Sequence, residues 1–127
     1  MALLWSLDSL ATATLFADTS KTVAITDGTG VAAVVPAGGT ITTDALQSTS
    51  GSRPTYRANY SGSGYPAIEF DGTADNLAIA HSSDWNVSVL DIFVVLTLTS
   101  SMGPGGILAK FTTGNWNDGW GIAVESG

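Results

Sequence analysis

The chain has 127 residues, of which 44% are hydrophobic and only 12% are charged. Disordered chains show the opposite balance, so we expect one folded domain that spans residues 1–127 around a single core. The net charge is −7 and there is no basic stripe to displace phosphate counterions, which excludes an ordinary nucleic-acid binder. The chain has no cysteine, and this excludes disulfides, thiolate metal sites and a cysteine nucleophile.

Two apolar stretches were tested as targeting or membrane segments. Residues 1–7 are apolar, but they lack a cationic start and Asp8 interrupts the run, so we expect no signal peptide. Residues 87–98 are broken by Ser88 and Asp91 and are too short to span a bilayer. The sequence therefore predicts no membrane insertion.

The first half of the chain is rich in short β-forming runs. Residues 3–7 are predicted as a strand. The runs at residues 23–26 and 31–35 surround the turn sequence Asp27-Gly28-Thr29-Gly30, which predicts a hairpin. Residues 40–52 are mostly Thr, Ser, Asp and Gln, a composition that favours an irregular surface segment.

The middle of the chain is predicted as two strands joined by a loop. Pro54 favours an extended conformation at the residue before it, so residues 55–58 are expected to lie along a sheet edge. Residues 61–64, Ser-Gly-Ser-Gly, are predicted as a flexible loop, and Pro66 marks the start of the next strand.

That second strand is predicted to end in a tight turn at residues 71–73, Asp-Gly-Thr. Glycine accepts a positive φ angle there, and the aspartate side chain bonds forward to the backbone. On either side of the turn, Phe70, Leu77 and Ile79 are placed to point into one core.

Residues 91–99 are the strongest predicted strand, and their near-continuous apolar run suggests a central position. Residues 107–111 and 120–124 are expected to pair as a hairpin. Strands thus recur with turn signals every ~8–12 residues, and no long stretch shows helical periodicity. The predicted fold class is an all-β antiparallel β-sandwich.

Several pieces of sequence occur in one order along the chain: Leu15-Phe16-Ala17-Asp18, Val31-Ala32, Arg53-Pro54-Thr55-Tyr56, Pro66-Ala67-Ile68-Glu69-Phe70-Asp71-Gly72-Thr73-Ala74-Asp75-Asn76-Leu77, Ile92-Phe93-Val94-Val95, Gly106-Ile107-Leu108-Ala109-Lys110 and Gly119-Trp120-Gly121-Ile122. In this order they resemble the concanavalin A-like (laminin G-like) jelly-roll domains of bacteriophage virion proteins. The resemblance covers nearly the whole chain.

This resemblance implies a concanavalin A-like jelly roll within a phage particle that is assembled in the host cytoplasm. Domains of this family continue with further strands after the Trp-Gly-Ile strand, whereas the sequence ends at Gly127. Exposed strand edges are normally covered or paired. We therefore expect that a neighbouring subunit completes the sandwich, or that the chain is the N-terminal portion or a fragment of a longer protein.

A pair of carboxylates raises the question of catalysis. Glycoside hydrolases of this fold use a strand motif Glu-x-Asp-x-x-Glu, and Glu69 and Asp71 match its first two positions on one strand face. Retaining hydrolysis needs two carboxyls about 5–5.5 Å apart. Because the third position of the motif is Ala74, this pair is incomplete. We therefore expect no enzymatic activity, with Glu69 outside and Asp71 starting the turn.

The same turn is a candidate calcium site. Asp71, Asp75 and Asn76 offer hard oxygen ligands, which calcium prefers, although their spacing does not match an EF-hand. The resemblance supports calcium here, because laminin G-like relatives include calcium-binding domains. The alternative is that these side chains only form the turn. No other cofactor is predicted.

The candidate carbohydrate-binding residues are Trp116, Asn117 and Asp118, at the predicted tip of the last hairpin. An aromatic face can hold the C–H side of a sugar while Asn and Asp bond its hydroxyls. The alternative is a simple turn flanked by core tryptophans such as Trp120.

Together these features predict a non-enzymatic structural or adhesive module of a phage virion, as a capsid decoration or part of a fibre or tail. The expected partners are other virion proteins, further copies of the chain in a homo-oligomer, and a host-surface glycan. One alternative is a glucanase-like carbohydrate-active enzyme domain, which the missing third carboxylate disfavours. The other is a bacterial surface lectin, which the missing signal peptide disfavours.

Overall fold

The computed structural model describes residues 15–36, 43–81, 91–92, 94–98, 105–110 and 120–124. These residues belong to two compact units, Met1–Leu90 and Asp91–Gly127, and each is described here by itself. All strand pairs in the described residues are antiparallel, and the described helical residues form two short 3-10 turns, η2 (Ser50–Ser52) and η3 (Tyr60–Gly62). The described part of the chain is therefore all-β, as the sequence predicted.

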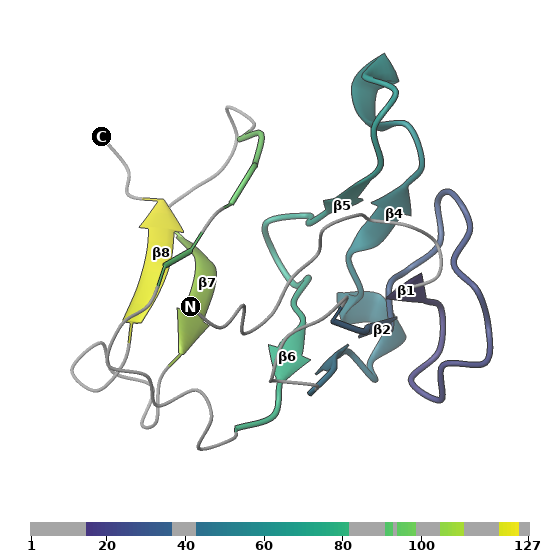
Figure 1. Ribbon diagram of the computed structural model, residues 1–127, viewed down its shortest axis with the longest axis horizontal. Coiled ribbons are helices and arrows are strands. Elements are labelled where there is room, and N and C mark those ends of the chain that lie inside the picture. The colour runs from purple at the N-terminus through teal and green to yellow at the C-terminus, as the bar shows by residue number, and fades with distance from the viewer. Residues whose placement is uncertain are drawn as a thin grey trace. The chain divides into compact units, whose positions relative to one another are not determined.

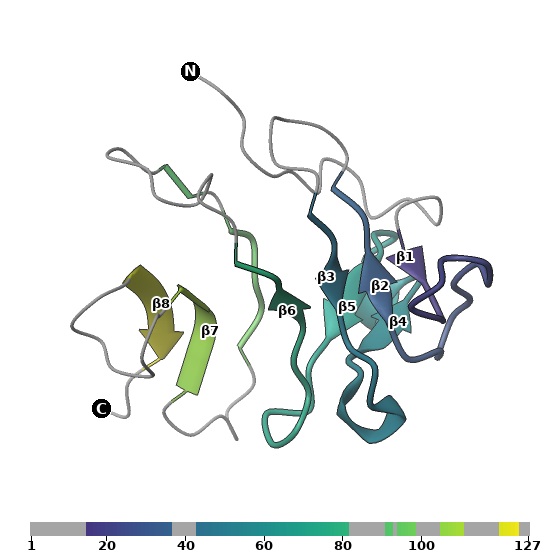
Figure 2. The same ribbon diagram turned by 90° about the horizontal axis from the view of Figure 1, so that it is seen from below.

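The first unit contains a sheet of four very short strands (Figure 1, Figure 2). Its order is β1 (Leu15–Phe16), β2 (Ala33–Val34), β3 (Ala45–Leu46) and β6 (Ala78–Ile79). The register places one residue of each strand in a single row across the sheet: Leu15, Val34, Ala45 and Ile79. Because side chains alternate between faces, this row shares one face, and its first three members are buried.

A second antiparallel pair in this unit contributes to the same core. Strands β4 (Thr55–Arg57) and β5 (Ala67–Glu69) place Tyr56 opposite Ile68. Tyr56 is 4% exposed and Ile68 packs against the same cluster. The buried residues of that cluster are Leu15, Ile25, Val31, Val34, Ala45 and Tyr56.

Backbone hydrogen bonds fasten β4 to the turn that precedes β2. The Val31 N–H donates to the Pro54 carbonyl at 2.7 Å, and the Tyr56 N–H donates to the Thr29 carbonyl at 2.9 Å. Between them, Gly30 forms an isolated antiparallel bridge with Thr55. The two sheets of the first unit are thus connected through this turn.

The second unit contains one described hairpin. Strand β7 (Gly105–Lys110) pairs with β8 (Trp120–Val124), and Lys110 lies opposite Trp120 while Leu108 lies opposite Ile122. The register shifts between Gly106 and Leu108. The prediction that residues 107–111 and 120–124 pair as a hairpin is confirmed.

The hairpin predicted at residues 23–35 is wrong. Ala24 bridges Phe16 instead, and β2 pairs with β1 and β3. The turn between the two runs bonds to β4, since the Gly28 N–H donates to the Tyr56 carbonyl at 2.9 Å. Residues 27–30 do form a turn, but this turn bonds residues 54–56 and does not join two paired strands.

Three further local predictions need correction. Residues 40–52 were expected to be irregular, yet Ala45 and Leu46 form β3 inside the four-stranded sheet because Ala45 completes a buried row. Residues 91–92 and 94–98 form no strand, and Val95 is fully exposed. Phe70 is 50% exposed, because β5 ends at Glu69 and Phe70 enters the following turn.

Other predictions in this region are confirmed. Strand β5 begins directly after Pro66, and Gly72 has a φ of 72° in the turn that follows it. Leu77 and Ile79 are partly buried against the core cluster. The strand predicted at residues 3–7 lies outside the described residues.

Candidate functional site

The Asp71 turn is organised by its own carboxylate. Asp71 Oδ1 accepts hydrogen bonds from the backbone N–H groups of Thr73, Ala74 and Asp75 at 2.8, 2.9 and 3.0 Å. Its Oδ2 accepts the hydroxyl proton of Thr73. These bonds favour the charged carboxylate, the Thr73 hydroxyl most of all, and they hold the pKa of Asp71 well below its ordinary value.

The two other predicted calcium ligands also have partners. Asp75 Oδ2 accepts the Asp71 N–H at 2.9 Å, and Asn76 Oδ1 accepts the Gln47 side-chain amide at 2.7 Å. The described residues contain no group of three or more His, Cys, Asp or Glu side chains placed to hold a metal ion. Each of these three side chains thus accepts a hydrogen bond within the protein.

Glu69 lies on β5 beside an arginine. Arg57 Nε donates to Glu69 Oε2 at 2.7 Å, and both side chains are about 40% exposed, at 43% and 41%. The strand register places these residues diagonally on one face of the β4–β5 pair. Glu69 is thus engaged in an ion pair on a partly exposed face of the strand pair.

Arg53 is a structural residue rather than a binding residue. Its Nε donates to the Gln47 carbonyl at 3.0 Å, and its two terminal nitrogens donate to the Ala17 and Ser48 carbonyls at 3.1 Å each. Ala17 follows β1, and Gln47 and Ser48 follow β3. The guanidinium therefore fastens the ends of two strands to the start of β4.

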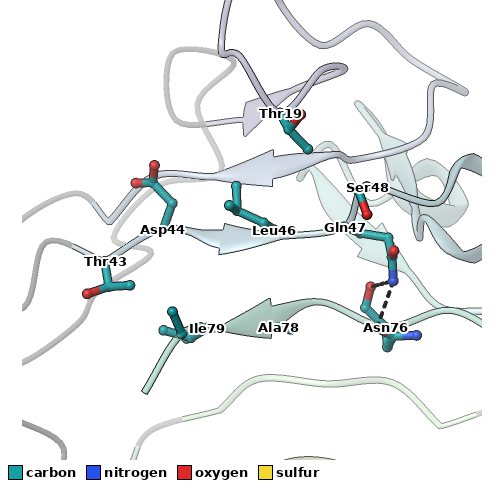
Figure 3. Close-up of a pocket in the computed structure, with 10 residues that line it drawn as sticks. Thr19, Thr43, Asp44, Leu46, Gln47, Ser48, Asn76, Ala78 and Ile79 are labelled. Atoms are coloured by element: carbon teal, nitrogen blue, oxygen red, sulfur yellow. Dashed lines mark hydrogen bonds between the residues drawn. The ribbon is translucent and has the colours of Figure 1, made fainter. Parts of the chain in front are cut away.

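An open depression of about 820 Å³ lies along β3 and β6 (Figure 3). Leu46, which is 39% exposed, contributes to its apolar surface together with Ala78 and Ile79. At one end the Lys21 ammonium pairs with Asp44 at 2.7 Å, and at the other Gln47 bonds Asn76. Because these polar groups already bond each other, the depression offers an apolar surface and no catalytic constellation.

Comparisons with protein-family models, with curated proteins and with solved structures found no match to this chain.

The predicted sugar-binding residues Trp116, Asn117 and Asp118 lie outside the described residues. Nearby, Trp120 is half-buried at the start of β8. Of the predicted calcium ligands, the structure brings Asp71 and Asp75 into direct contact, while Asn76 is turned towards Gln47. In the described part of the chain, no helix has the length and apolar character needed to cross a membrane.

Sequence reasoning missed the depression and the ordered loop at residues 59–65. The depression depends on the pairing of β3 with β6, which are far apart in sequence. The loop carried a usable signal, because residues 59–65 consist only of Asn, Tyr, Ser and Gly.

Proposed function

We propose that this chain is a non-enzymatic structural or adhesive module of a bacteriophage particle, built as a concanavalin A-like jelly roll. The observation that carries the non-enzymatic part is the engagement of both candidate carboxylates. Glu69 pairs with Arg57 Nε, and Asp71 accepts four hydrogen bonds from its own turn. Glycoside hydrolysis needs a pair of carboxyls that flank the scissile bond, and the third acidic position of the hydrolase motif is Ala74 here.

The all-β architecture and the ordered sequence resemblance support the jelly-roll and virion parts of the proposal. The composition agrees with an extracellular particle surface, because the net charge of −7 favours solubility and disfavours contact with packaged nucleic acid. Many copies in one particle would supply avidity even where each site binds weakly.

Contacts between copies of the chain, or with other virion proteins, form part of the proposal. Val94, Val95, Leu96 and Leu98 are between 43% and 104% exposed. Several exposed apolar side chains close together in sequence are candidates for protein contacts. Light scattering after size exclusion tests this directly: we expect a mass above that of one 12.9 kDa chain, and a stable monomer at high concentration would count against it.

Mass spectrometry of purified particles tests the virion assignment. We expect peptides of this chain to co-purify with capsid and portal proteins through a density gradient. Their absence from purified particles would overturn the assignment. Hydrolysis assays on soluble glucans test the non-enzymatic part, and turnover that disappears in Glu69→Gln would overturn it.

A further inference from the structure

The loop that joins β4 to β5 is ordered, uncharged and extended away from the four-stranded sheet of its unit (Figure 1). No charged residue occurs between Arg57 and Glu69, although the chain as a whole has a net charge of −7. Its tip, residues 59–65, reads Asn-Tyr-Ser-Gly-Ser-Gly-Tyr. Contact loops of binding proteins favour these four residue types, because tyrosine offers a large rigid contact area and the others adapt their hydrogen bonds.

Three hydrogen bonds connect residues within this tip. The Tyr60 N–H donates to the Tyr65 carbonyl at 3.0 Å, and the Ser63 N–H donates to the Tyr60 carbonyl at 3.0 Å. The Asn59 side-chain oxygen accepts the Gly64 N–H at 2.7 Å. These bonds lie in and around the loop predicted at residues 61–64.

The tip also contains backbone conformations that side chains rarely adopt. Ser61 has a φ of 51°, and Gly62 and Gly64 have φ angles of 73° and 81°. A loop already held in its bound conformation loses less entropy when it binds. The ordering thus favours a contact role over that of a simple connector.

Tyr65 is the exposed aromatic group of the tip, with 76% of its surface accessible. A tyrosine ring offers an apolar face for the C–H side of a sugar, and its hydroxyl bonds a sugar hydroxyl. A protein partner would need about 20–30 residues on each side, far more than a tip of this size presents. The absence of charge within residues 58–68 favours a neutral ligand.

We propose that the 59–65 tip is a binding subsite for a neutral saccharide, with the Tyr65 ring against the sugar face. This inference rests on the adhesive part of the proposed function, and it assigns a sugar contact to residues other than Trp116. It does not depend on the virion assignment, which particle mass spectrometry tests separately.

The test uses an array of immobilised neutral and sialylated glycans, probed with the full chain and four variants. We expect the wild type to be retained on neutral glycans and Tyr65→Ala to bind about tenfold more weakly. Tyr65→Phe keeps the ring and should retain most of the binding. Phe70→Ala removes an aromatic side chain that is 50% exposed outside the tip, and should bind as the wild type does.

Three outcomes would overturn the inference. Unchanged binding by Tyr65→Ala, together with loss in Trp116→Ala, would place the sugar site elsewhere and leave the adhesive function standing. No retention of the wild type, or retention on sialylated glycans alone, would refute a neutral-saccharide subsite. A drop in oligomer mass in Tyr65→Ala during size exclusion would identify the tip as a protein contact instead. Thermal unfolding of each variant confirms that the folded protein was measured.

Discussion

Replacing Arg53 with alanine should destabilise the first unit much more than replacing Arg57 does. The guanidinium donates to the carbonyls of Ala17, Gln47 and Ser48, which belong to segments distant in sequence. Truncation leaves all three acceptors without this donor. Water can replace the hydrogen bond to the exposed Ser48 carbonyl, but it replaces those to the part-buried Gln47 and Ala17 carbonyls less well.

The magnitude follows from the burial of each bond. The bonds to Gln47 and Ala17 are partly buried, and a charged donor in such a place contributes about 1–1.5 kcal/mol. The bond to Ser48 is exposed and contributes about 0.5 kcal/mol. We therefore expect Arg53→Ala to cost about 3 kcal/mol, a large fraction of the stability of a small domain. Arg53→Lys should recover less than half of this, because one ammonium cannot match a planar fork of donors.

Arg57, at the end of β4, provides a control with the same side chain. Its ion pair with Glu69 joins two side chains that are each about 40% exposed, so Arg57→Ala should cost about 0.5 kcal/mol or less. Urea unfolding followed by tryptophan fluorescence gives the free energy of unfolding for each variant. Equal losses in Arg53→Ala and Arg57→Ala, or a loss below about 0.5 kcal/mol in Arg53→Ala, would refute the reasoning.

Three further predictions concern the same unit. Asp71→Asn removes a carboxylate whose pKa is lowered on folding, and the charged form of that carboxylate stabilises the fold above its ordinary pKa of 3.8. The loss of unfolding free energy relative to wild type should therefore be largest near pH 6 and shrink as the pH falls below 3.8. A loss that stays constant in an acid unfolding series would contradict this. Gly30→Ala would bring a Cβ to 3.1 Å from Arg53 Cβ, so we expect a loss of about 1 kcal/mol in urea melts, whereas Gly51→Ala meets nothing within 4 Å and should be neutral. Leu15→Ala empties a fully buried position and should cost about 3 kcal/mol, and an equally stable variant would show that the core is misplaced.

The carboxylate turn shows how far local reasoning reaches. The sequence Asp71-Gly72-Thr73 predicted a turn with the aspartate bonded forward, and the structure places its carboxylate on three backbone N–H groups. The bond from Gln47 to Asn76 could not be predicted in this way. It joins residues 29 positions apart, and it depends on the pairing of β3 with β6.

Local chemistry in the sequence determined which segments turn and which extend. Pro66 set the start of β5, glycine allowed the positive φ at position 72, and two β-forming runs around a turn predicted the pairing of β7 with β8. These features depend on neighbouring residues, so the sequence carries them directly.

Only the tertiary structure decided which segments become neighbours. The run before β2 bonds β4 instead of residues 23–26, and the polar stretch around Ala45 becomes an inner strand. Phe70 is half exposed although the sequence placed it in the core, and Val95 is fully exposed although it belongs to an apolar run. A strand's burial depends on what covers it, and that partner is selected by the whole chain because many segments compete for the same backbone hydrogen bonds and apolar contacts.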